Sequence, residues 1–248
     1  MDTPPELRVG TSGWNYSDWR GRFYPEEVAS SEYLRYYAGG FDTVEVNYSF
    51  YHLPRPATYR KWAEQTPDGF VFAVKASRYI THIKRLKGIE KEWSTFLENA
   101  AALGKKLGPI LLQLPPSSRA DLRALSRFLK MRRPLPEVKL AFEFRHASWF
   151  DPEILEALRQ SRAGLVIANS ERYPQAPCVP TADFVYLRFH GPGQLFASAY
   201  SNADLEPWAR RVRDWLAAGR IVYAYFNNDF HAHAIANART LLRTSVSG

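Results

Sequence analysis

Two opposite charges occupy alternate positions at the end of an apolar segment, at Glu143 and Arg145. Residues 139–145 predict a strand, and alternate side chains of a strand share a face. If Leu140, Phe142 and Phe144 face covering helices, the two charged side chains face whatever the strand encloses. Ionised groups are rarely buried without a partner. The pair is therefore either a structural ion pair or part of a functional site, and the other strands must decide between these interpretations.

Polar side chains end the other predicted strands in the same way. The segments that predict strands are residues 7–11, 43–47, 70–75, 110–114, 139–145, 164–168, 184–190 and 221–226. The polar residues at or just after their ends are Thr11 or Ser12, Glu45 with Asn47, Lys75, Gln113, Glu143 with Arg145, Asn169, Arg188 with His190, and Asn227 with Asn228. In a parallel barrel the carboxyl ends of the strands meet at one face, where active sites lie. We therefore expect these side chains to converge on one pocket.

Helical patterns separate most of these strands. Apolar residues keep helical spacing over residues 93–107, and Asp151-Pro152-Glu153 combines an N-cap, an N1 proline and a first-turn acid. Residues 169–183 contain three prolines and leave little room for a helix, so this link after the sixth strand is expected to be degenerate. Eight strands alternating with helices in 248 residues predict an α/β fold, a single (β/α)8 TIM-barrel domain over residues 1–248. A doubly wound open sheet is the alternative.

Composition limits the class of protein more than its function. The chain is 46% hydrophobic and can bury a large core, and no apolar run approaches the ~20 residues of a membrane span. The first residues carry no signal-peptide pattern, and the single cysteine, Cys178, permits no internal disulfide. We therefore expect a soluble cytoplasmic protein that does not contact membranes. The net charge of +8 favours anionic partners, although basic and acidic residues are dispersed among one another.

On the odd-numbered predicted strands, the side chains of the expected pocket carry more positive than negative charge. The odd strands contribute Lys75, Glu143, Arg145, Arg188 and His190, and the even strands contribute Glu45, Gln113, Asn169 and Asn227. Cations around one cavity repel one another unless carboxylates or a bound anion compensate. We therefore expect a ligand with at least one anionic group, such as a phosphate. Backbone amides of Gly191-Pro192-Gly193 and of Asn227-Asn228, after the last two strands, are candidates to hold it.

These residue types support acid–base chemistry on an anionic substrate, as in a hydrolase or a lyase. The predicted catalytic residues are Glu45, Lys75, Glu143 and His190. The predicted substrate-binding residues are Trp14, Asn47, His82, Gln113, Arg145, Arg188, Asn227 and Asn228. Two carboxylates across a barrel would also suit a glycosidase, for which the distance between them decides the stereochemical outcome.

A metal site is a weaker variant of this hypothesis. Glu45, His82, Glu143 and His190 could ligate an ion, but the chain contains no short ligand motif, and His231-x-His233 alone is a weak signal. No cofactor is predicted, and no metal is expected to be required for folding.

Nucleic-acid or nucleotide binding, without established catalysis, is the competing hypothesis. The basic residues Lys84, Arg85, Lys87 and Lys91 follow the third predicted strand, and aromatic residues that could stack on bases are Trp14, Tyr16, Trp19 and Tyr79. The basic run could equally be a solvated surface, and the aromatic residues could equally fold their loop onto the barrel mouth. Steep salt dependence of binding would favour the nucleic-acid hypothesis.

A set of motifs in order along the chain closely resembles a known family. They are Gly10-Thr-Ser-Gly-Trp14, Trp19-x-Gly-x-Phe-Tyr-Pro25, Val44-Glu-x-Asn47, Phe50-Tyr51, Lys75, Thr81-His82, Leu112-Gln-Leu-Pro-Pro116, Glu143-Phe-Arg145, Ser148-Trp149, Tyr186-x-Arg-x-His-Gly191, Phe226-Asn-Asn228 and Asn237-Ala238. The family is the YecE-like family, domain of unknown function 72. The resemblance implies a TIM barrel and no established reaction. Where the family commonly has glycines after the Asn-Asn pair, this chain has His231-Ala232-His233.

Overall fold

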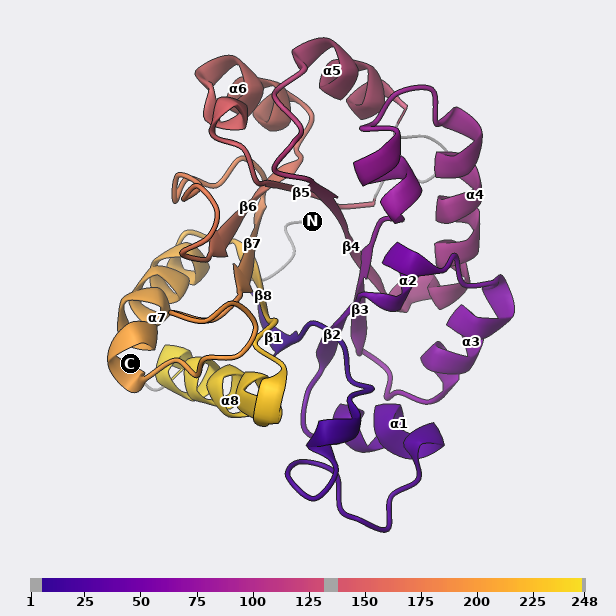
Figure 1. The fold of residues 1–248 in the computed structure, drawn as a ribbon, viewed down its shortest axis with the longest axis vertical. Coiled ribbons are helices and arrows are strands. Elements are labelled where there is room, and N and C mark those ends of the chain that lie inside the picture. The colour runs from indigo at the N-terminus through magenta and orange to yellow at the C-terminus, as the bar shows by residue number, and fades with distance from the viewer. Residues whose placement is uncertain (1–5, 132–137, 247–248) are drawn as a thin grey trace.

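The computed structural model describes residues 6–131 and 138–246. Eight parallel strands form one sheet in the order β1-β8-β7-β6-β5-β4-β3-β2. They are β1 (Leu7–Thr11), β2 (Thr43–Val46), β3 (Val71–Lys75), β4 (Leu107–Leu114), β5 (Leu140–Phe144), β6 (Gly164–Asn169), β7 (Phe184–Phe189) and β8 (Ile221–Phe226). The sheet curves until β1 and β2 lie side by side, with helices around the outside (Figure 1). The chain is therefore a (β/α)8 TIM barrel, as predicted, and the open-sheet alternative is wrong.

Helices follow most strands on the outside of the barrel. They are α1 (Tyr33–Ala38), α2 (Tyr48–Tyr51), α3 (Pro56–Glu64), α4 (Glu90–Ala100), α5 (Leu122–Lys130), α6 (Pro152–Gln160), α7 (Asn202–Ala217) and α8 (His233–Val246). The predicted start of α6 is confirmed, because Asp151 accepts a hydrogen bond from the Glu153 N–H at 2.9 Å and Pro152 occupies the first turn. No helix links β6 to β7 in this fully described stretch, so the predicted degenerate link is confirmed.

The region after α4 differs from the prediction. Helical spacing of apolar residues runs through Leu107, but α4 ends at Ala100, and a 3-10 turn over residues 101–106 leads into β4 at Leu107. Gly104 in this turn has a φ of 59°, a conformation that glycine adopts readily and that interrupts the helical backbone beyond α4. Leu103 stays buried beyond the break, which is why apolar spacing alone predicted a continuous helix.

Alternation along the strands separates two cores. Leu140, Phe142 and Phe144 of β5 pack outward against the helices, as predicted, whereas Ala141 belongs to the barrel interior. The interior core consists of Ala73, Leu111, Ala141, Val166, Ala182, Phe184, Tyr186, Ile221, Tyr223 and Tyr225. On β5 and β7 the charged side chains of Glu143 and Arg188 follow this apolar filling toward the carboxyl ends of the strands, so they lie on a packed floor.

Tyr37 of α1 closes the barrel where β1 meets β2. The Thr11 N–H donates to the Tyr37 hydroxyl at 2.9 Å, and this hydroxyl donates to the Thr43 carbonyl at 3.0 Å. A Cβ atom at Gly10 would lie 2.3 Å from the same carbonyl oxygen, so only glycine permits this close approach of the two strands. A side-chain hydroxyl therefore bridges the two strands.

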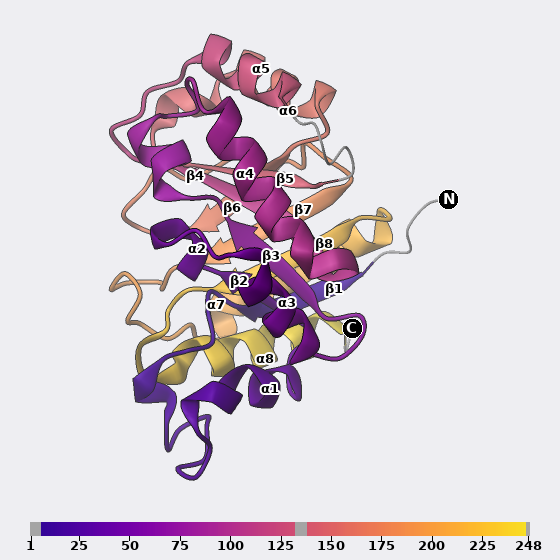
Figure 2. The ribbon, with the colours of Figure 1, turned by 90° about the vertical axis from the view of Figure 1, so that its right-hand side faces the viewer.

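The barrel mouth is seen from the side in Figure 2, where α2 lies beyond the carboxyl ends of the strands, on the left. Helix α2 follows β2 directly, and the 3-10 and π turns after β1 and β3 lie near the same end of the barrel. Among the helices within residues 6–131 and 138–246, none has the length and apolar character that crossing a membrane requires.

Candidate functional site at the barrel mouth

Arg188 of β7 joins two carboxylates across the barrel. Its Nε and Nη2 groups donate to the two oxygens of Glu45 on β2 at 3.0 and 2.7 Å. Its Nη1 group donates to Glu143 Oε2 on β5 at 2.5 Å. Each of the three side chains is at most 1% exposed. The structure thus brings together three of the predicted residues as a buried Glu–Arg–Glu triad, with charge-assisted hydrogen bonds in bidentate geometry on one side.

Further donors complete the hydrogen bonding of this triad. The Tyr186 hydroxyl donates to Glu45 Oε2 at 2.6 Å, from two residues before Arg188 on the same strand face. Gln113, directly opposite Glu143 in the β4–β5 ladder, donates to Glu143 Oε2 at 2.9 Å. The predicted role of Gln113 in binding substrate is therefore less apt than a role in positioning Glu143, because its amide is buried and already engaged.

The environment of the triad keeps both carboxylates ionised. Burial alone would raise the pKa of Glu45 and of Glu143, but the charge of Arg188 and the hydrogen bonds outweigh burial. The pKa of Glu45 is lowered, and that of Glu143 lies well below its ordinary value. A carboxyl group with a lowered pKa is a poor proton donor near neutral pH. Neither group is therefore suited to act as a general acid.

His190, just beyond β7, is buried and neutral. Its Nδ1 atom faces the Asn227 amide nitrogen at 3.1 Å, and its Nε2 atom lies 3.6 Å from Glu143 Oε1. The Nε2 atom also lies 3.4 Å from Arg188 Nη1, so a carboxylate and a guanidinium both face this side of the ring. Burial, followed by the charge of Arg188, lowers the pKa of His190 to about 4. The imidazole therefore carries no charge near neutral pH.

Lys75 differs from the other charged groups because its amine has no polar partner. The residue ends β3 and is 9% exposed, and its Nζ atom lies 4.3 Å from the centroid of the Phe50 ring. The Nζ atom makes no hydrogen bond or ion pair with any residue that the structure describes, whereas the Lys75 carbonyl accepts from Ser49 Oγ at 2.6 Å. Burial, followed by the charge of Arg188, lowers the pKa of Lys75 to about 7, against the opposing effect of Glu143 and Glu45.

Arg145 and His82 lie at the rim of the mouth. The Nε group of Arg145 donates to Glu143 Oε1 at 2.9 Å, and its guanidinium lies 4.2 Å from the centroid of the Tyr173 ring. The Arg145 side chain is 12% exposed, which makes it the more accessible guanidinium of the mouth. The His82 ring meets Phe50 edge-on at 4.9 Å, and burial with the nearby Lys75 charge lowers the pKa of His82 to about 4.

In the loops after β7 and β8, three of the backbone amides that were predicted to hold a phosphate have partners within the protein. The Gly191 N–H donates to the Tyr200 hydroxyl at 3.1 Å, the Gly193 N–H donates to Ser198 Oγ at 3.0 Å, and the Asn227 N–H donates to the Phe189 carbonyl at 2.8 Å. These amides are already paired within the protein. The side chain of Asn228 is also buried, and its amide nitrogen donates to Ser198 O and Asn237 Oδ1, which engages this group within the protein.

The aromatic loop after β1 folds onto the barrel mouth. Trp19 is fully buried and its indole N–H donates to the Asp229 carbonyl at 2.7 Å. The Tyr16 hydroxyl donates to the Ser12 carbonyl at 2.5 Å. Trp19 is therefore packed within the protein, whereas Tyr16 is partly buried and lines a neighbouring cavity.

Four residues of the mouth were not among the predicted site residues. They are Phe50, Tyr173, Tyr186 and Asp229. Period-two alternation could have indicated Tyr186, because it shares a strand face with Arg188. Tyr173 lies in the irregular β6–β7 link, where no sequence pattern applies. Burial raises the pKa of Asp229 to about 8, which makes this residue a carboxyl that can hold a proton near neutral pH.

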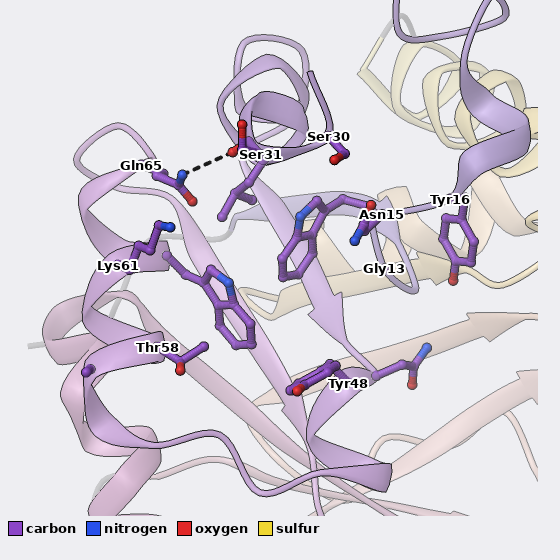
Figure 3. A pocket seen from close by; sticks show the side chains of 14 residues that line it. Gly13, Asn15, Tyr16, Ser30, Ser31, Tyr48, Thr58, Lys61 and Gln65 are labelled. Carbon is purple, nitrogen blue, oxygen red and sulfur yellow. Dashed lines mark hydrogen bonds between the residues drawn. The ribbon is translucent and has the colours of Figure 1, made fainter. Parts of the chain in front are cut away.

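A cavity of about 710 Å³ is lined by the loop after β1, residues 30–34 at the start of α1, residues 47–48 after β2, and α3 with the residue after it (Figure 3). Its walls include Trp14, Tyr48 and Trp62, with Trp14 and Trp62 edge-to-face at 5.3 Å, and polar groups such as Asn47 and Lys61. The predicted residues Trp14 and Asn47 thus line this cavity and not the triad. Asn47 follows Glu45 by two residues in the chain.

Metal ligation finds no support in the arrangement of side chains. Among residues 6–131 and 138–246, no group of three or more His, Cys, Asp or Glu side chains could hold an ion. Glu45 and Glu143 face Arg188, and His82 belongs to the rim beside Phe50.

Comparisons with known proteins agree with this architecture. A model of the family described as "Protein of unknown function DUF72" matches residues 8–246. The chain is 35% identical over 236 residues to the UPF0759 protein YecE of Escherichia coli strain K12, covering 84% of this chain and 82% of YecE. It is 24% identical over 272 residues to the UPF0759 protein YunF of Bacillus subtilis, covering 95% and 93%. The crystal structure of a DUF72 family protein from Thermotoga maritima is similar with a TM-score of 0.84 and 29% identity, covering 96% of this chain and 98% of that one.

Proposed function

The chain belongs to the DUF72 family of proteins of unknown function, and from this premise we propose that it is an enzyme that acts on a small anionic substrate at the barrel mouth. In this proposal Lys75 transfers a proton or attacks the substrate, and Arg145 holds the anionic group. Glu45, Glu143 and Arg188 then maintain the electrostatic environment of the amine, a role different from the acid–base role that the sequence suggested for the carboxylates.

The observation that carries the proposal is the unpartnered amine of Lys75. Placing a lysine that is only 9% exposed where its amine has no protein partner costs free energy, and the active-site face of a TIM barrel is where catalysis could use such a group. The three members of the triad satisfy one another, and His190 is engaged with Asn227. Groups with strongly shifted pKa values that lie in a cleft are candidates for catalysis. Lys75 meets this criterion, since its pKa of about 7 lets the amine accept or release a proton near neutral pH.

The balance of charge supports an anionic substrate. The two carboxylates of the mouth are matched by the guanidinium groups of Arg188 and Arg145, so a protonated Lys75 leaves an excess positive charge. An anion would offset that charge and raise the pKa of Lys75. Arg145 can contact such an anion, because its Nη2 group makes no hydrogen bond with a described residue and its side chain reaches the rim.

A thermal-shift series tests this proposal. Phosphate, sugar phosphates and nucleotides are compared at constant ionic strength on the wild-type protein, on Arg145→Met and on Arg172→Met. Binding at ~100 times the dissociation constant adds about 2.7 kcal/mol, or roughly 5–10 °C in melting temperature for a domain of this size. Arg172 is the matched control, since it is exposed and lies beside the same Tyr173 ring. Stabilisation that disappears in Arg145→Met and persists in Arg172→Met supports the proposal, and stabilisation that survives in both variants contradicts it.

Nucleic-acid binding is the second candidate, favoured by one surface feature. Tyr79 is 41% exposed, and Lys84 Nζ lies 5.8 Å from the centroid of its ring, in the basic segment after β3. An exposed ring beside cations is the arrangement that binds single strands by stacking and charge. Short oligonucleotides in the same series decide this point. Stabilisation that falls steeply with salt and is lost in Tyr79→Ala would support nucleic-acid binding.

A further inference from the structure

The surroundings of Lys75 Nζ suit a nucleophile better than a cation that serves only to hold an anion. One side of the amine faces the ring of Phe50, and no protein oxygen among the described residues accepts a hydrogen bond from it. By contrast, Lys106 Nζ donates to the carbonyls of Ala63 and Thr66 at 2.6 and 2.7 Å. The lone pair of a neutral amine at position 75 is therefore free to attack. A lysine with a structural role would donate hydrogen bonds to protein oxygens, as Lys106 does.

We propose that Lys75 forms an imine with the carbonyl carbon of a small aldehyde or ketone that carries a carboxylate or phosphate group. This inference rests on the proposed function and names its substrate class and covalent step. Amines activated by a hydrophobic pocket and nearby cations form such adducts. Phe50 supplies the apolar wall, and Arg188 is the nearby cation.

The step balances without an oxidant or a reductant. The Lys75 nitrogen attacks the carbonyl carbon, a C–N bond forms, and the π electrons move to the carbonyl oxygen, which takes up a proton. The first proton comes from the attacking nitrogen, and the hydroxyl of the resulting carbinolamine takes up a second proton from solvent and leaves as water while the nitrogen lone pair forms the C=N bond. The protonated imine carries a positive charge. The ionised carboxylates Glu45 and Glu143, whose charges act on Lys75, stabilise this cation relative to a neutral carbonyl.

The anionic group of the substrate follows from the position of Arg145. Its charge also acts on Lys75, and its guanidinium is exposed enough at the rim to contact a carboxylate or a phosphate. Both groups accept paired hydrogen bonds from a guanidinium. We therefore infer a substrate that has a carbonyl carbon and an anionic group. The experiment below distinguishes a carboxylate from a phosphate.

Reductive trapping tests the inference. The wild-type protein is incubated at about pH 7.5 with pyruvate in one arm and glyceraldehyde 3-phosphate in the other, together with sodium cyanoborohydride. Intact-mass and peptide mass spectrometry then locate the adduct, whose mass is that of the carbonyl compound less one oxygen atom. Free lysine amide in the same reaction is the internal standard. Its amine has a pKa of about 10.4 and is only about 0.1% neutral at this pH, so Lys75 should react on the order of a hundredfold faster.

Variants complete the test. In Lys75→Arg, which keeps a positive charge but cannot form an imine, the adduct should be absent while far-ultraviolet circular dichroism stays like that of the wild type. Lys106 provides a comparison within the same digest and should remain unmodified. An adduct at Lys75 in either arm supports the inference. No adduct at Lys75 in both arms, or equal labelling of Lys75 and Lys106, overturns it.

The inference and the proposed function can fail separately. Stabilisation by phosphate that depends on Arg145 requires no covalent step. If this stabilisation is present and trapping at Lys75 is absent, the anion-binding enzyme stands and the imine is wrong. If both are absent, neither stands.

Discussion

Replacing Arg188 by Met should destabilise the protein strongly, because it leaves Glu45 and Glu143 buried without their common partner. Both carboxylates are at most 1% exposed, and Arg188 donates to three of their four oxygens. Breaking a buried ion pair from one side costs about 3–5 kcal/mol. For a domain of this size that loss corresponds to roughly 6–20 °C in melting temperature.

The stability lost in Arg188→Met, relative to the wild type, should become smaller as the pH falls. In the wild-type protein the pKa values of Glu45 and Glu143 are lowered, so their stabilising contribution is fully present above the unfolded value of about 4.3 and is lost only as pH falls through the folded values. Without Arg188, burial raises both pKa values. The variant then takes up more protons on folding than the wild type does, so the difference in stability between the two proteins shrinks from about pH 8 to about pH 5.

Urea unfolding followed by fluorescence at about pH 8, 6.5 and 5 measures this difference. Arg145→Met is the control, because it removes a guanidinium at the rim and leaves Glu143 paired with Arg188. The double variant Glu45→Gln with Arg188→Met should regain part of the lost stability at about pH 8, since it buries one charge fewer. A loss below about 1 kcal/mol in Arg188→Met, or one that does not change with pH, would refute the account of the triad.

Two further predictions concern the junction between β1 and β2 and the imidazole of His190. Tyr37→Phe should cost about 1–3 kcal/mol, because it leaves the buried Thr11 N–H and Thr43 carbonyl without the bridging hydroxyl, and urea unfolding should show no such loss for the exposed control Tyr36→Phe. His190 should remain neutral from about pH 8 down to about pH 5, because burial and Arg188 lower its pKa to about 4; nitrogen-15 chemical shifts of the ring that titrate near the ordinary value of about 6.5 would contradict this.

The fold was predictable because hydrophobic alternation and polar strand ends are local signals. The outward Phe142 and inward Glu143 follow from period two alone, and the strand count then determines the barrel. The α4–β4 junction was not predictable from apolar spacing, since α4 ends at Ala100 and the backbone conformation of Gly104 interrupts the following turn, neither of which spacing registers. Gly10 likewise appears as an ordinary strand residue until Thr43 is seen beside it.

The sequence indicated which residues lie at the barrel mouth but not which of them form hydrogen bonds with one another. Sequence placed Glu45, Glu143 and Arg188 at strand ends, but their mutual hydrogen bonds depend on barrel stagger, which the sequence does not state. From the excess of cations the sequence predicts that Arg188 helps to bind an anionic substrate, whereas in the structure Arg188 donates its hydrogen bonds to Glu45 and Glu143. What is left for a substrate is Lys75 and Arg145, and this distinction required the three-dimensional contacts.

The central claim, that Lys75 presents a reactive amine at the mouth, is tested most directly by the pH dependence of its acetylation. Brief labelling with acetic anhydride at a series of pH values, with peptide mass spectrometry, gives the rate at Lys75 alone. The account predicts that the rate rises with a midpoint at pH about 7 and that phosphate shifts this midpoint upward. A rate that is still rising near pH 10, as for an unperturbed lysine with a pKa of about 10.4, would contradict it.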